Sequence, residues 1–157
     1  MRNHEISLAR QGDDKYLHRL EEDCFSPVDI FRPAQFRYLL GSPSCRILVI
    51  REDGGRVLAE LVGLFRHFSI PSGRIYKIAV HPSLRGQGWG GRLIEAMEVE
   101  FIKAGMVKAF AEIRESNKKS WAMFEKNGYF VIRKLPGYYV DGEVGVKFRK
   151  ILGSGCV

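Results

Sequence analysis

The stretch Arg85-Gly86-Gln87-Gly88-Trp89-Gly90-Gly91 lies between a predicted strand and a predicted amphipathic helix. Its glycines allow the backbone to turn sharply and leave the N–H groups uncovered by Cβ atoms. At the entrance of a helix, such N–H groups add to the positive end of the helix dipole and form a cradle for phosphate. Arg85 can add charge and a bidentate contact to the same anion. The segment therefore predicts a phosphate-binding turn.

Two other interpretations of this turn are disfavoured. A loop without a ligand is disfavoured because three glycines fall within five residues, at Gly86, Gly88 and Gly90, just where a helix begins. A dinucleotide-binding fingerprint is the second alternative, since Gly86, Gly88 and Gly91 satisfy G-x-G-x-x-G. Glu112, 21 residues after Gly91, matches its acidic position. However, five residues separate the strand from the first glycine, and the 66 residues after Gly91 are too few for a doubly wound sheet.

Strand and helix patterns alternate on both sides of the turn. Strands are predicted at residues 5–10, 45–51, 56–69, 74–80, 107–114, 129–134 and 143–151, and helices at about 13–24, 33–41, 89–104 and 117–127. The strand over 56–69 is apolar on both faces, so it is expected to be central. One strand–helix–strand unit lies within an otherwise antiparallel order, which predicts a mixed α/β fold.

Length and composition indicate one globular domain over residues 1–157. With 45% hydrophobic residues, the chain can bury a core without a disulfide or a metal. Cys24, Cys45 and Cys156 are far apart and form no CxxC pair, and no His/Cys/Asp/Glu cluster has metal-ligand spacing. The first ten residues lack a signal-peptide core, and no apolar run reaches the roughly 18 residues that span a bilayer. A cytoplasmic protein without a membrane segment is expected.

The charge balance is basic, with 25 Lys and Arg against 18 Asp and Glu, a net charge of +7. Such a chain attracts anions, including nucleic acid, acidic proteins and phosphorylated cofactors. Nucleic-acid binding usually gathers its basic residues into one patch, whereas here they are scattered along the sequence. Nucleic acid is therefore not expected to be the main partner.

Three blocks of sequence resemble, in order and spacing, the GNAT superfamily of acetyl-CoA-dependent N-acetyltransferases. Arg85-Gly86-Gln87-Gly88-Trp89-Gly90 fits the superfamily signature R/Q-x-x-G-x-G/A. The later blocks Ala111-Glu112-Ile113-Arg114-Glu115-Ser116-Asn117 and Met123-Phe124-Glu125-Lys126-Asn127-Gly128-Tyr129 are similar to later blocks of the superfamily. The resemblance is strong over residues 74–131 and weaker over most of the remaining chain.

The resemblance implies a central mixed sheet of about seven strands flanked by four helices, with two parallel strands that splay apart to admit acetyl-CoA. It implies that backbone groups of Ile78–Val80 hold the acetyl-pantetheine arm. It also implies that the amides from Gly86 to Gly91 hold the pyrophosphate and that Asn117 orients the pantetheine end. The residues expected to contact acetyl-CoA are Ile78, Ala79, Val80, Arg85, Gly86, Gln87, Gly88, Trp89, Gly90, Gly91, Asn117 and Phe124.

Within the superfamily, the sequence most resembles ribosomal-protein-alanine N-acetyltransferases and related protein N-terminal acetyltransferases. The block Glu112–Asn117 is similar to theirs, and Tyr138-Tyr139-Val140-Asp141-Gly142-Glu143 resembles a tyrosine-pair hairpin that borders their peptide site. This implies direct transfer, in a ternary complex, to the N-terminal α-amine of a protein or peptide. The alternatives are the same chemistry on a small-molecule amine or a lysine side chain, or a catalytically weak acetyl-CoA-binding module. The oligomeric state stays open.

Glu112 is the candidate general base, acting through water. Strand alternation places Phe110, Glu112 and Arg114 on one face of the sheet. An acid at the end of a central strand beside a cofactor cleft is well placed for proton transfer. The alternative is a structural ion pair between Glu112 and Arg114 or Lys108 on the same face. An α-amine, with a pKa of about 7.7–8.0, asks less of a base than a lysine with a pKa of about 10.4.

Phe124 stands where most superfamily members have a tyrosine that protonates the leaving thiolate, twelve residues after the acidic position. Because a thiol has a pKa of about 8.5, a thiolate leaves tolerably without an acid, so transfer does not require that tyrosine. Tyr138, Tyr139, Tyr129 or a water is the candidate replacement. Each of these tyrosines has an alternative as a surface or core ring.

Residues 25–31 match the region that usually covers the acceptor site in the superfamily. Phe25 and Phe31 are expected to belong to the core rather than to contact the substrate. His81, followed by Pro82, is interpreted as the turn that ends a strand rather than as a catalytic base.

Overall fold

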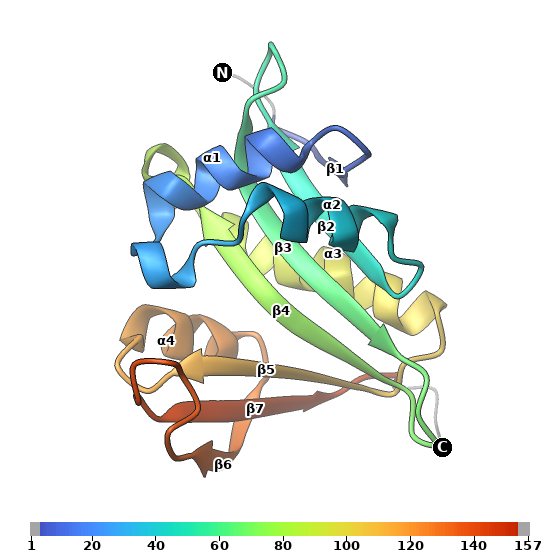
Figure 1. The fold of residues 1–157 in the computed structure, drawn as a ribbon. Coiled ribbons are helices and arrows are strands. Elements are labelled where there is room, and N and C mark those ends of the chain that lie inside the picture. The colour runs from blue at the N-terminus through green and yellow to red at the C-terminus, as the bar shows by residue number, and fades with distance from the viewer. Residues whose placement is uncertain (1–3, 154–157) are drawn as a thin grey trace.

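Seven strands form one twisted sheet in the computed structural model, which describes residues 4–153 (Figure 1). The strands are β1 (Ile6–Leu8), β2 (Cys45–Arg51), β3 (Val57–Arg66), β4 (Ser72–Val80), β5 (Lys108–Arg114), β6 (Phe130–Leu135) and β7 (Gly145–Ile151). The helices are α1 (Asp14–Cys24), α2 (Pro33–Gly41), α3 (Trp89–Lys103) and α4 (Lys118–Lys126), with short 3₁₀ turns at Pro27–Asp29 and Pro82–Leu84. The predicted mixed α/β fold is confirmed.

The strand order is β1-β2-β3-β4-β5-β7-β6, and every neighbouring pair except one is antiparallel. The exception is β4 and β5, which run parallel and are joined through α3. The predicted strand–helix–strand unit is therefore confirmed at the centre of the sheet.

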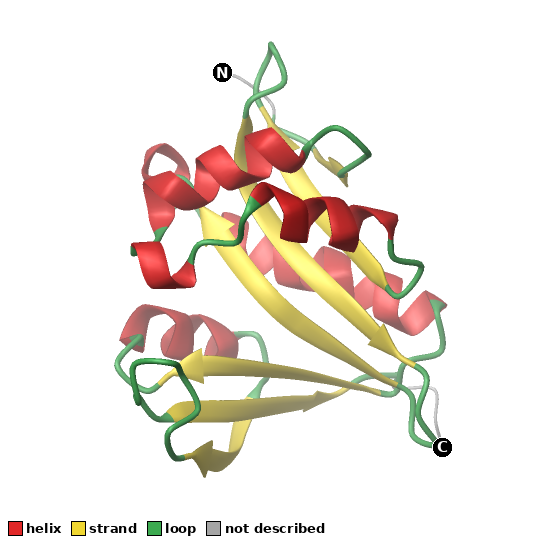
Figure 2. Ribbon diagram, viewed as in Figure 1, coloured by secondary structure: helices red, strands yellow, loops and turns green. Residues whose placement is uncertain are grey.

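Helices cover the two halves of the sheet unequally (Figure 2). On one face, α1 and α2 pack on β2, β3 and β4 through Leu17, Leu20 and Phe36. On the opposite face, α3 and α4 pack through a larger core that includes Met97 and Phe124. Figure 2 shows no helix in front of β5, β7 and β6 on the α1–α2 side, so within residues 4–153 that part of the sheet is uncovered.

Strand β3 is central, as its two apolar faces predicted. Every residue from Val57 to Phe65 is buried, and only Arg66 is exposed. The strand pairs along its length with β2 on one side and β4 on the other. Its side chains reach both cores, which explains why its hydrophobic pattern does not alternate.

The predicted boundaries around the turn between β3 and β4 were wrong. The strand predicted over 56–69 ends at Arg66, and the strand predicted to begin at Arg74 begins at Ser72. Ser72 and Gly73, which the predicted bounds leave between the two strands, instead pair with β3 and with β5. A Cβ atom on Gly73 would lie 2.5 Å from the ring of Phe101, so this glycine is required by close packing of α3 on the sheet.

Strands β4 and β5 separate partway along their length, as the resemblance implied. Pairing joins only Ser72–Ile75 to Lys108–Ala111, and the two strands then diverge (Figure 1). At the start of the divergence, the register of β4 against β3 shifts around Tyr76, as in a β-bulge. Beyond Ile75, the edge of β4 that faces β5 has no partner strand among the described residues.

Candidate active site

The turn before α3 has the backbone conformation that the sequence predicted. Gly86 and Gly88 have φ values of 77° and 82°, in the left-handed region that disfavours side chains. The positions where their Cβ atoms would lie have nothing within 4 Å, so the backbone there is open. Among residues 4–153, the amide N–H groups from Gly86 to Gly91 have no hydrogen-bond acceptor. Bare amides at the positive end of a long helix fit a diphosphate.

The other predicted residues of this turn also have defined places. The Arg85 Nε atom donates to the carbonyl oxygen of Val80 at 3.0 Å, and the Gln87 side chain donates to the Ser83 carbonyl at 3.3 Å. The Trp89 ring packs against the main core, and the guanidinium of Arg92 lies 4.6 Å from its centre. These contacts tie the turn to β4 and to the core, so its backbone is held in place.

Gly90 and Gly91 let α3 approach α4. A Cβ atom on Gly90 would lie 2.5 Å from the sulfur of Met123, and one on Gly91 would lie 3.4 Å from the amide of Asn127. The backbone N–H groups of Gly90 and Gly91 are still among those without a hydrogen-bond acceptor in residues 4–153. These two glycines therefore allow close helix packing and also leave their N–H groups available.

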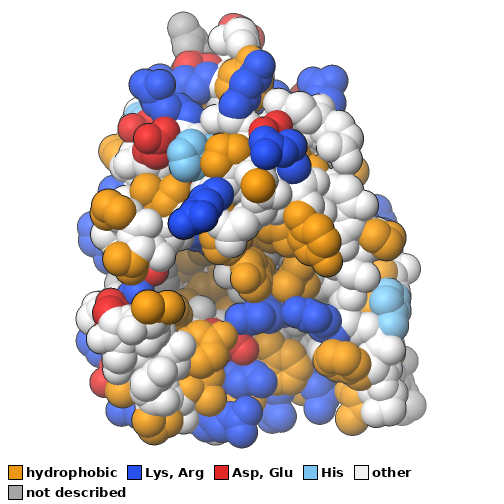
Figure 3. All heavy atoms as spheres, in the orientation of Figure 1, with side chains coloured by type: hydrophobic (Ala, Val, Ile, Leu, Met, Phe, Trp, Pro, Cys, Tyr) orange, Lys and Arg blue, Asp and Glu red, His pale blue; other side chains and the backbone are white. Residues whose placement is uncertain are grey.

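A cleft of about 470 Å³ occupies the space where β4 and β5 diverge. Figure 3 shows this face of the molecule hollowed between the α1–α2 layer and β5. The cleft is lined by Ile78 of β4, by Glu112 of β5, by Phe124 of α4 and the preceding Asn117, and by Tyr138 and Tyr139 of the β6–β7 loop. The separation of the strands thus brings several predicted site residues to one cavity.

Glu112 lies at the junction of β5 with this cleft, and its ionic partner is Arg74 of β4. The Arg74 Nε atom donates to Glu112 Oε2 at 2.8 Å. Arg114 and Lys108, the partners considered from the sequence, do not pair with Glu112. Burial alone would lower the pKa of Arg74, but the neighbouring Glu112 carboxylate raises this pKa above its ordinary value. The other carboxylate oxygen, Oε1, has no hydrogen-bond partner within residues 4–153.

The tyrosine pair of the β6–β7 loop borders the same end of the cleft. The Tyr138 hydroxyl accepts a hydrogen bond from Arg74 at 2.9 Å, so Arg74 joins it to Glu112. The rings of Tyr138 and Tyr139 meet edge to face, with centres 5.1 Å apart. Burial raises the pKa of Tyr139 to about 12, so its hydroxyl stays protonated at neutral pH.

Arg114 links the two loops that flank the cleft. Its guanidinium donates to Asp29 of the 3₁₀ turn after α1 at 2.8 Å, and to Asp141 and Glu143 of the β6–β7 loop at 2.8 and 3.0 Å. The same group lies 4.2 Å from the centre of the Tyr139 ring. Hydrogen bonding to Asp29 is the largest of the contacts that raise the pKa of Arg114.

Lys77 of β4 holds the α1 side of the cleft. Its ammonium group donates to Glu21 at 2.7 Å and to the backbone carbonyl of Asp29. It also lies over the rings of Phe31 and Phe25, at 3.7 and 4.7 Å from their centres. Both phenylalanines are half-buried, pack on the α1–α2 core and line the cleft, so the structure assigns them to the core and the cavity together.

Three further candidates are placed by the structure. Phe124 is buried and packs on Tyr129 while lining the cleft. The Tyr129 hydroxyl donates to Glu98 at 2.8 Å, and Tyr129 is not among the residues that line the cleft. Asn117 caps α4 by accepting from the Ser120 amide at 3.2 Å. Of the candidate tyrosines, Tyr138 and Tyr139 are the two at the cavity.

His81 follows the last residue of β4, as predicted from the proline that comes next in the sequence. Its imidazole accepts from the Ser83 amide at 3.1 Å and so caps the 3₁₀ turn. Cys24 and Cys45 are free thiols, and Cys156 lies outside the described residues. Within residues 4–153, no three His, Cys, Asp or Glu side chains gather as a metal site. None of the helices in this part of the chain qualifies as a membrane span.

The sequence did not identify Arg74 or Asp29 as site residues, nor Arg114 as a link between the two loops. Alternation along β4 and β5 could have shown that both arginines point away from the buried face. Nothing local in the sequence indicates which distant carboxylates they meet.

Residues 15–129 match the family model described as "Acetyltransferase (GNAT) family". The Yersinia enterocolitica protein named "Acetyltransferase YE1169" is 28% identical over 131 residues, covering 80% of this chain and 86% of its own.

Two solved structures illustrate the likeness in fold. The ribosomal-protein-S18-alanine N-acetyltransferase of Escherichia coli matches with a TM-score of 0.79 and 20% identity, covering 99% of both chains. A nourseothricin acetyltransferase matches with a TM-score of 0.77 and 17% identity, covering 96% of this chain and 99% of the other.

Proposed function

The chain belongs to the GNAT family of acetyltransferases, and from that premise we propose that it acetylates the N-terminal α-amine of a protein or peptide. Members of this family transfer the acetyl group of acetyl-CoA. The fold is shared by an enzyme named for a ribosomal protein and by one named for an antibiotic, so the fold does not choose the acceptor. The choice of a peptide acceptor therefore depends on the shape of the cleft.

The observation that supports a peptide acceptor is the position of Glu112 between two cavities that share part of their lining. The cleft between β4 and β5 shares Arg74, Glu112 and Tyr138 with a second pocket of about 540 Å³ on the uncovered face of the sheet. An amine bound beside Glu112 would therefore lie next to a second recess that a continuing chain could occupy. A free small amine needs no such recess.

Removal of the proton from the acceptor amine is assigned to Glu112. Arg74 holds one carboxylate oxygen, which fixes the side chain and leaves Oε1 to accept a proton directly or through water. An α-amine suits this base, because roughly a tenth of such amines are already neutral at pH 7.

The acetyl donor is assigned to the other side of the cleft. Acetyl-CoA supplies the acetyl group as a thioester when it is bound. Backbone amides from Gly86 to Gly91 would hold its diphosphate, and the edge of β4 at Ile78–Val80, which has no partner strand among the described residues, would line its acyl-bearing arm. Asn117, at the N-terminus of α4, and Phe124 within that helix would border the same arm. The acceptor amine then attacks directly in a ternary complex.

Protonation of the departing thiolate is assigned to the tyrosine pair. Phe124 has no proton to give, and the Tyr129 hydroxyl is engaged with Glu98. Tyr139 stays protonated because burial raises its pKa to about 12, and Tyr138 lies beside Glu112 through Arg74. A thiol pKa of about 8.5 makes this assistance modest rather than essential.

We place the reaction in the cytoplasm, which keeps Cys24 and Cys45 reduced.

The test is release of CoA thiol from acetyl-CoA and an array of short peptides with varied first residues. Saturable turnover with free N-termini, and none with the same peptides blocked at the N-terminus, is the expected result. Turnover of blocked peptides through an internal lysine, or of small amines alone, would move the acceptor to the alternative classes. Acetyl-CoA binding without turnover on any acceptor would identify a binding module, the alternative that Phe124 motivates.

A further inference from the structure

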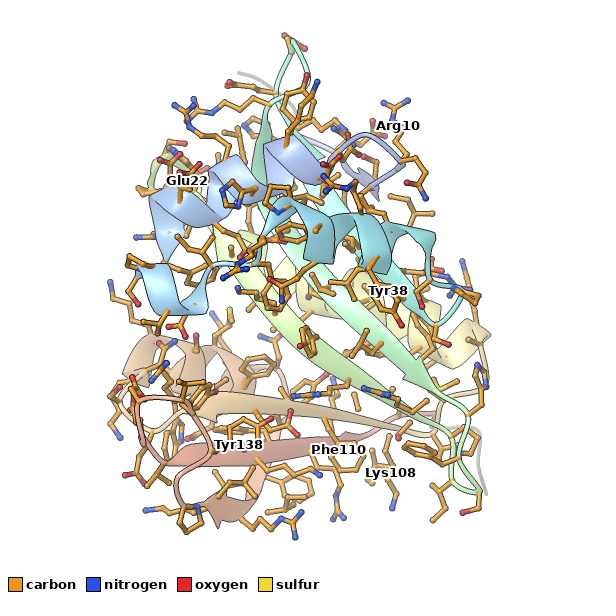
Figure 4. The ribbon with its side chains drawn as sticks, viewed as in Figure 1. Arg10, Glu22, Tyr38, Lys108, Phe110 and Tyr138 are labelled. Atoms are coloured by element: carbon orange, nitrogen blue, oxygen red, sulfur yellow. The ribbon has the colours of Figure 1, made fainter. Side chains whose placement is uncertain are left out.

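The second pocket, here called the basic groove, lies on the face of β5 and β7 that no described helix covers. It is lined by Arg66, Phe68, Ile70, Lys108, Phe110 and Lys147, together with residues shared with the cleft. Figure 4 shows Lys108, Phe110 and Tyr138 on the same open face in front of β5 and β7. Because the groove shares Arg74, Glu112 and Tyr138 with the cleft, it begins where the acceptor amine is proposed to bind.

The charge of the groove is positive and uncompensated. Arg66, Lys108 and Lys147 form no ion pair with any carboxylate among residues 4–153. The only carboxylate in the groove lining, Glu112, is already paired with Arg74. A recess lined by unpaired cations concentrates the positive potential and attracts an anionic ligand.

The groove also has apolar surface, and its geometry suits a peptide. Phe68 and Ile70 are 66% and 53% exposed at its rim. The ammonium of Lys147 lies 4.7 Å from the centre of the Phe110 ring, so one face of that ring is covered and is not free to stack on a nucleic-acid base. Lys108 precedes Glu112 by four strand residues, or about 13 Å, which an extended peptide spans with about four residues.

We propose that the basic groove binds an acidic segment of the acceptor protein, lying at about the third to fifth residues after the acetylated N-terminus. The proposal rests on the proposed function for its direction, since the chain is taken to enter from Glu112. The lysines on β5 and β7 would pair with the acidic side chains, and Phe68 and Ile70 would contact apolar ones between them. The groove would then select among acceptors by their downstream sequence.

The first test compares hexapeptides that share their first two residues and carry acidic, amide or lysine side chains at positions three to five. For the wild-type chain we expect KM to be about tenfold lower for the acidic peptide than for the amide peptide, with the preference shrinking in about 0.3 M salt. The variant Lys108→Glu/Lys147→Glu should remove or reverse that preference. The matched control Lys15→Glu/Lys103→Glu makes the same change in net charge at two exposed lysines outside both cavities and should keep it.

A second measurement keeps the groove testable if no peptide is acetylated. Fluorescence anisotropy with N-terminally blocked acidic and amide peptides reports binding alone. Tighter binding of the acidic peptide, lost in Lys108→Glu/Lys147→Glu, supports the groove even where the proposed function fails. Equal treatment of acidic and amide peptides in both assays overturns it. Binding of an oligouridylate through the same lysines, without any preference for acidic peptides, would also overturn it and would assign the groove to nucleic acid.

Discussion

On the cofactor side of the cleft, the candidate binding groups are consecutive backbone amides from Gly86 to Gly91, presented by one turn and one helix. On the acceptor side, they are side chains that come from distant parts of the chain. Arg114 reaches Asp29 across 85 residues, and Arg74 reaches Tyr138 across 64 residues. The first region is defined by backbone conformation, and the second by long-range ionic contacts.

This difference separates the effects of substitutions. A side chain added to the turn should change cofactor affinity, because it alters backbone conformation and covers N–H groups. Loss of a charge around the tyrosine pair should change acceptor affinity, because it frees the loops without touching the turn. Glu112 lies where the two regions meet and should affect the chemical step itself.

Replacement of Glu112 by glutamine should give the largest effect. Glutamine keeps the shape but cannot accept the amine proton as a carboxylate does, so kcat/KM should fall by about 10²–10⁴. The dissociation constant of acetyl-CoA should stay near the wild-type value. Glu115→Gln is the matched control, since Glu115 pairs with Lys134 and does not line the cleft. Equal kcat/KM in the two variants would leave Glu112 with only its ion pair to Arg74.

Replacement of Gly88 by valine should weaken acetyl-CoA binding by about tenfold or more. A β-branched residue is strained at a positive φ by about 1–3 kcal/mol, and its side chain would stand beside the amides. Gly54→Val is the matched control, because Gly54 has a φ of 96° and equally open surroundings in the β2–β3 hairpin. Calorimetric titration of both variants with acetyl-CoA separates the two effects. The cradle is refuted should Gly88→Val bind as tightly as Gly54→Val.

Replacement of Arg114 by glutamine should raise KM for a peptide acceptor by about tenfold. The neutral side chain loses its charged contacts to Asp29, Asp141 and Glu143, each a charge-assisted hydrogen bond. Affinity for acetyl-CoA should not change, since Arg114 lies away from the glycine turn. Arg37→Gln removes a single exposed ion pair to Asp14 and serves as control. A loss confined to kcat, with KM unaltered, would contradict a role in holding the loops.

The same contrast explains what the sequence could predict of the site. The glycine turn is contiguous, and its conformation follows from local rules about Cβ atoms and helix ends, so the sequence alone predicts it. The direction of Glu112 follows from strand alternation, and the burial pattern of β5 confirms it. The predicted ionic partner of Glu112 was wrong. The observed partner, Arg74, lies on the neighbouring strand, and only the register of β4 on β5 brings the two side chains together.

The fold shows the same limit at the turn between β3 and β4. Ser72 and Gly73 are residues typical of turns, yet both lie within β4. Gly73 is small because the Phe101 ring of α3 packs against it, and its strand conformation is set by pairing on both sides. Pairing partners and helix contacts of this kind are tertiary facts that override local turn propensity.

A buried carboxyl group, Glu60, is expected to affect the stability of the fold rather than either side of the cleft. Glu60 of β3 is fully buried, and neither carboxylate oxygen has a hydrogen-bond partner among the described residues. Burial raises the pKa of Glu60 well above its ordinary value, and the neighbouring Glu21 adds to the effect. The raised pKa means that the folded state holds this proton more tightly than the unfolded chain does.

Replacement of Glu60 by glutamine should therefore change the pH dependence of stability rather than activity. A raised folded pKa stabilises the fold fully below the unfolded value of about 4.3, and this contribution is lost as pH rises toward the folded value. Glutamine has no such proton, so the free energy of unfolding of Glu60→Gln relative to wild type should be higher at pH 7.5 than at pH 4. Urea unfolding at the two pH values measures this, with the exposed Glu125→Gln as control. A difference between Glu60→Gln and wild type that is the same at both pH values would show that Glu60 is ionised in the fold, with Lys77 as its counter-charge.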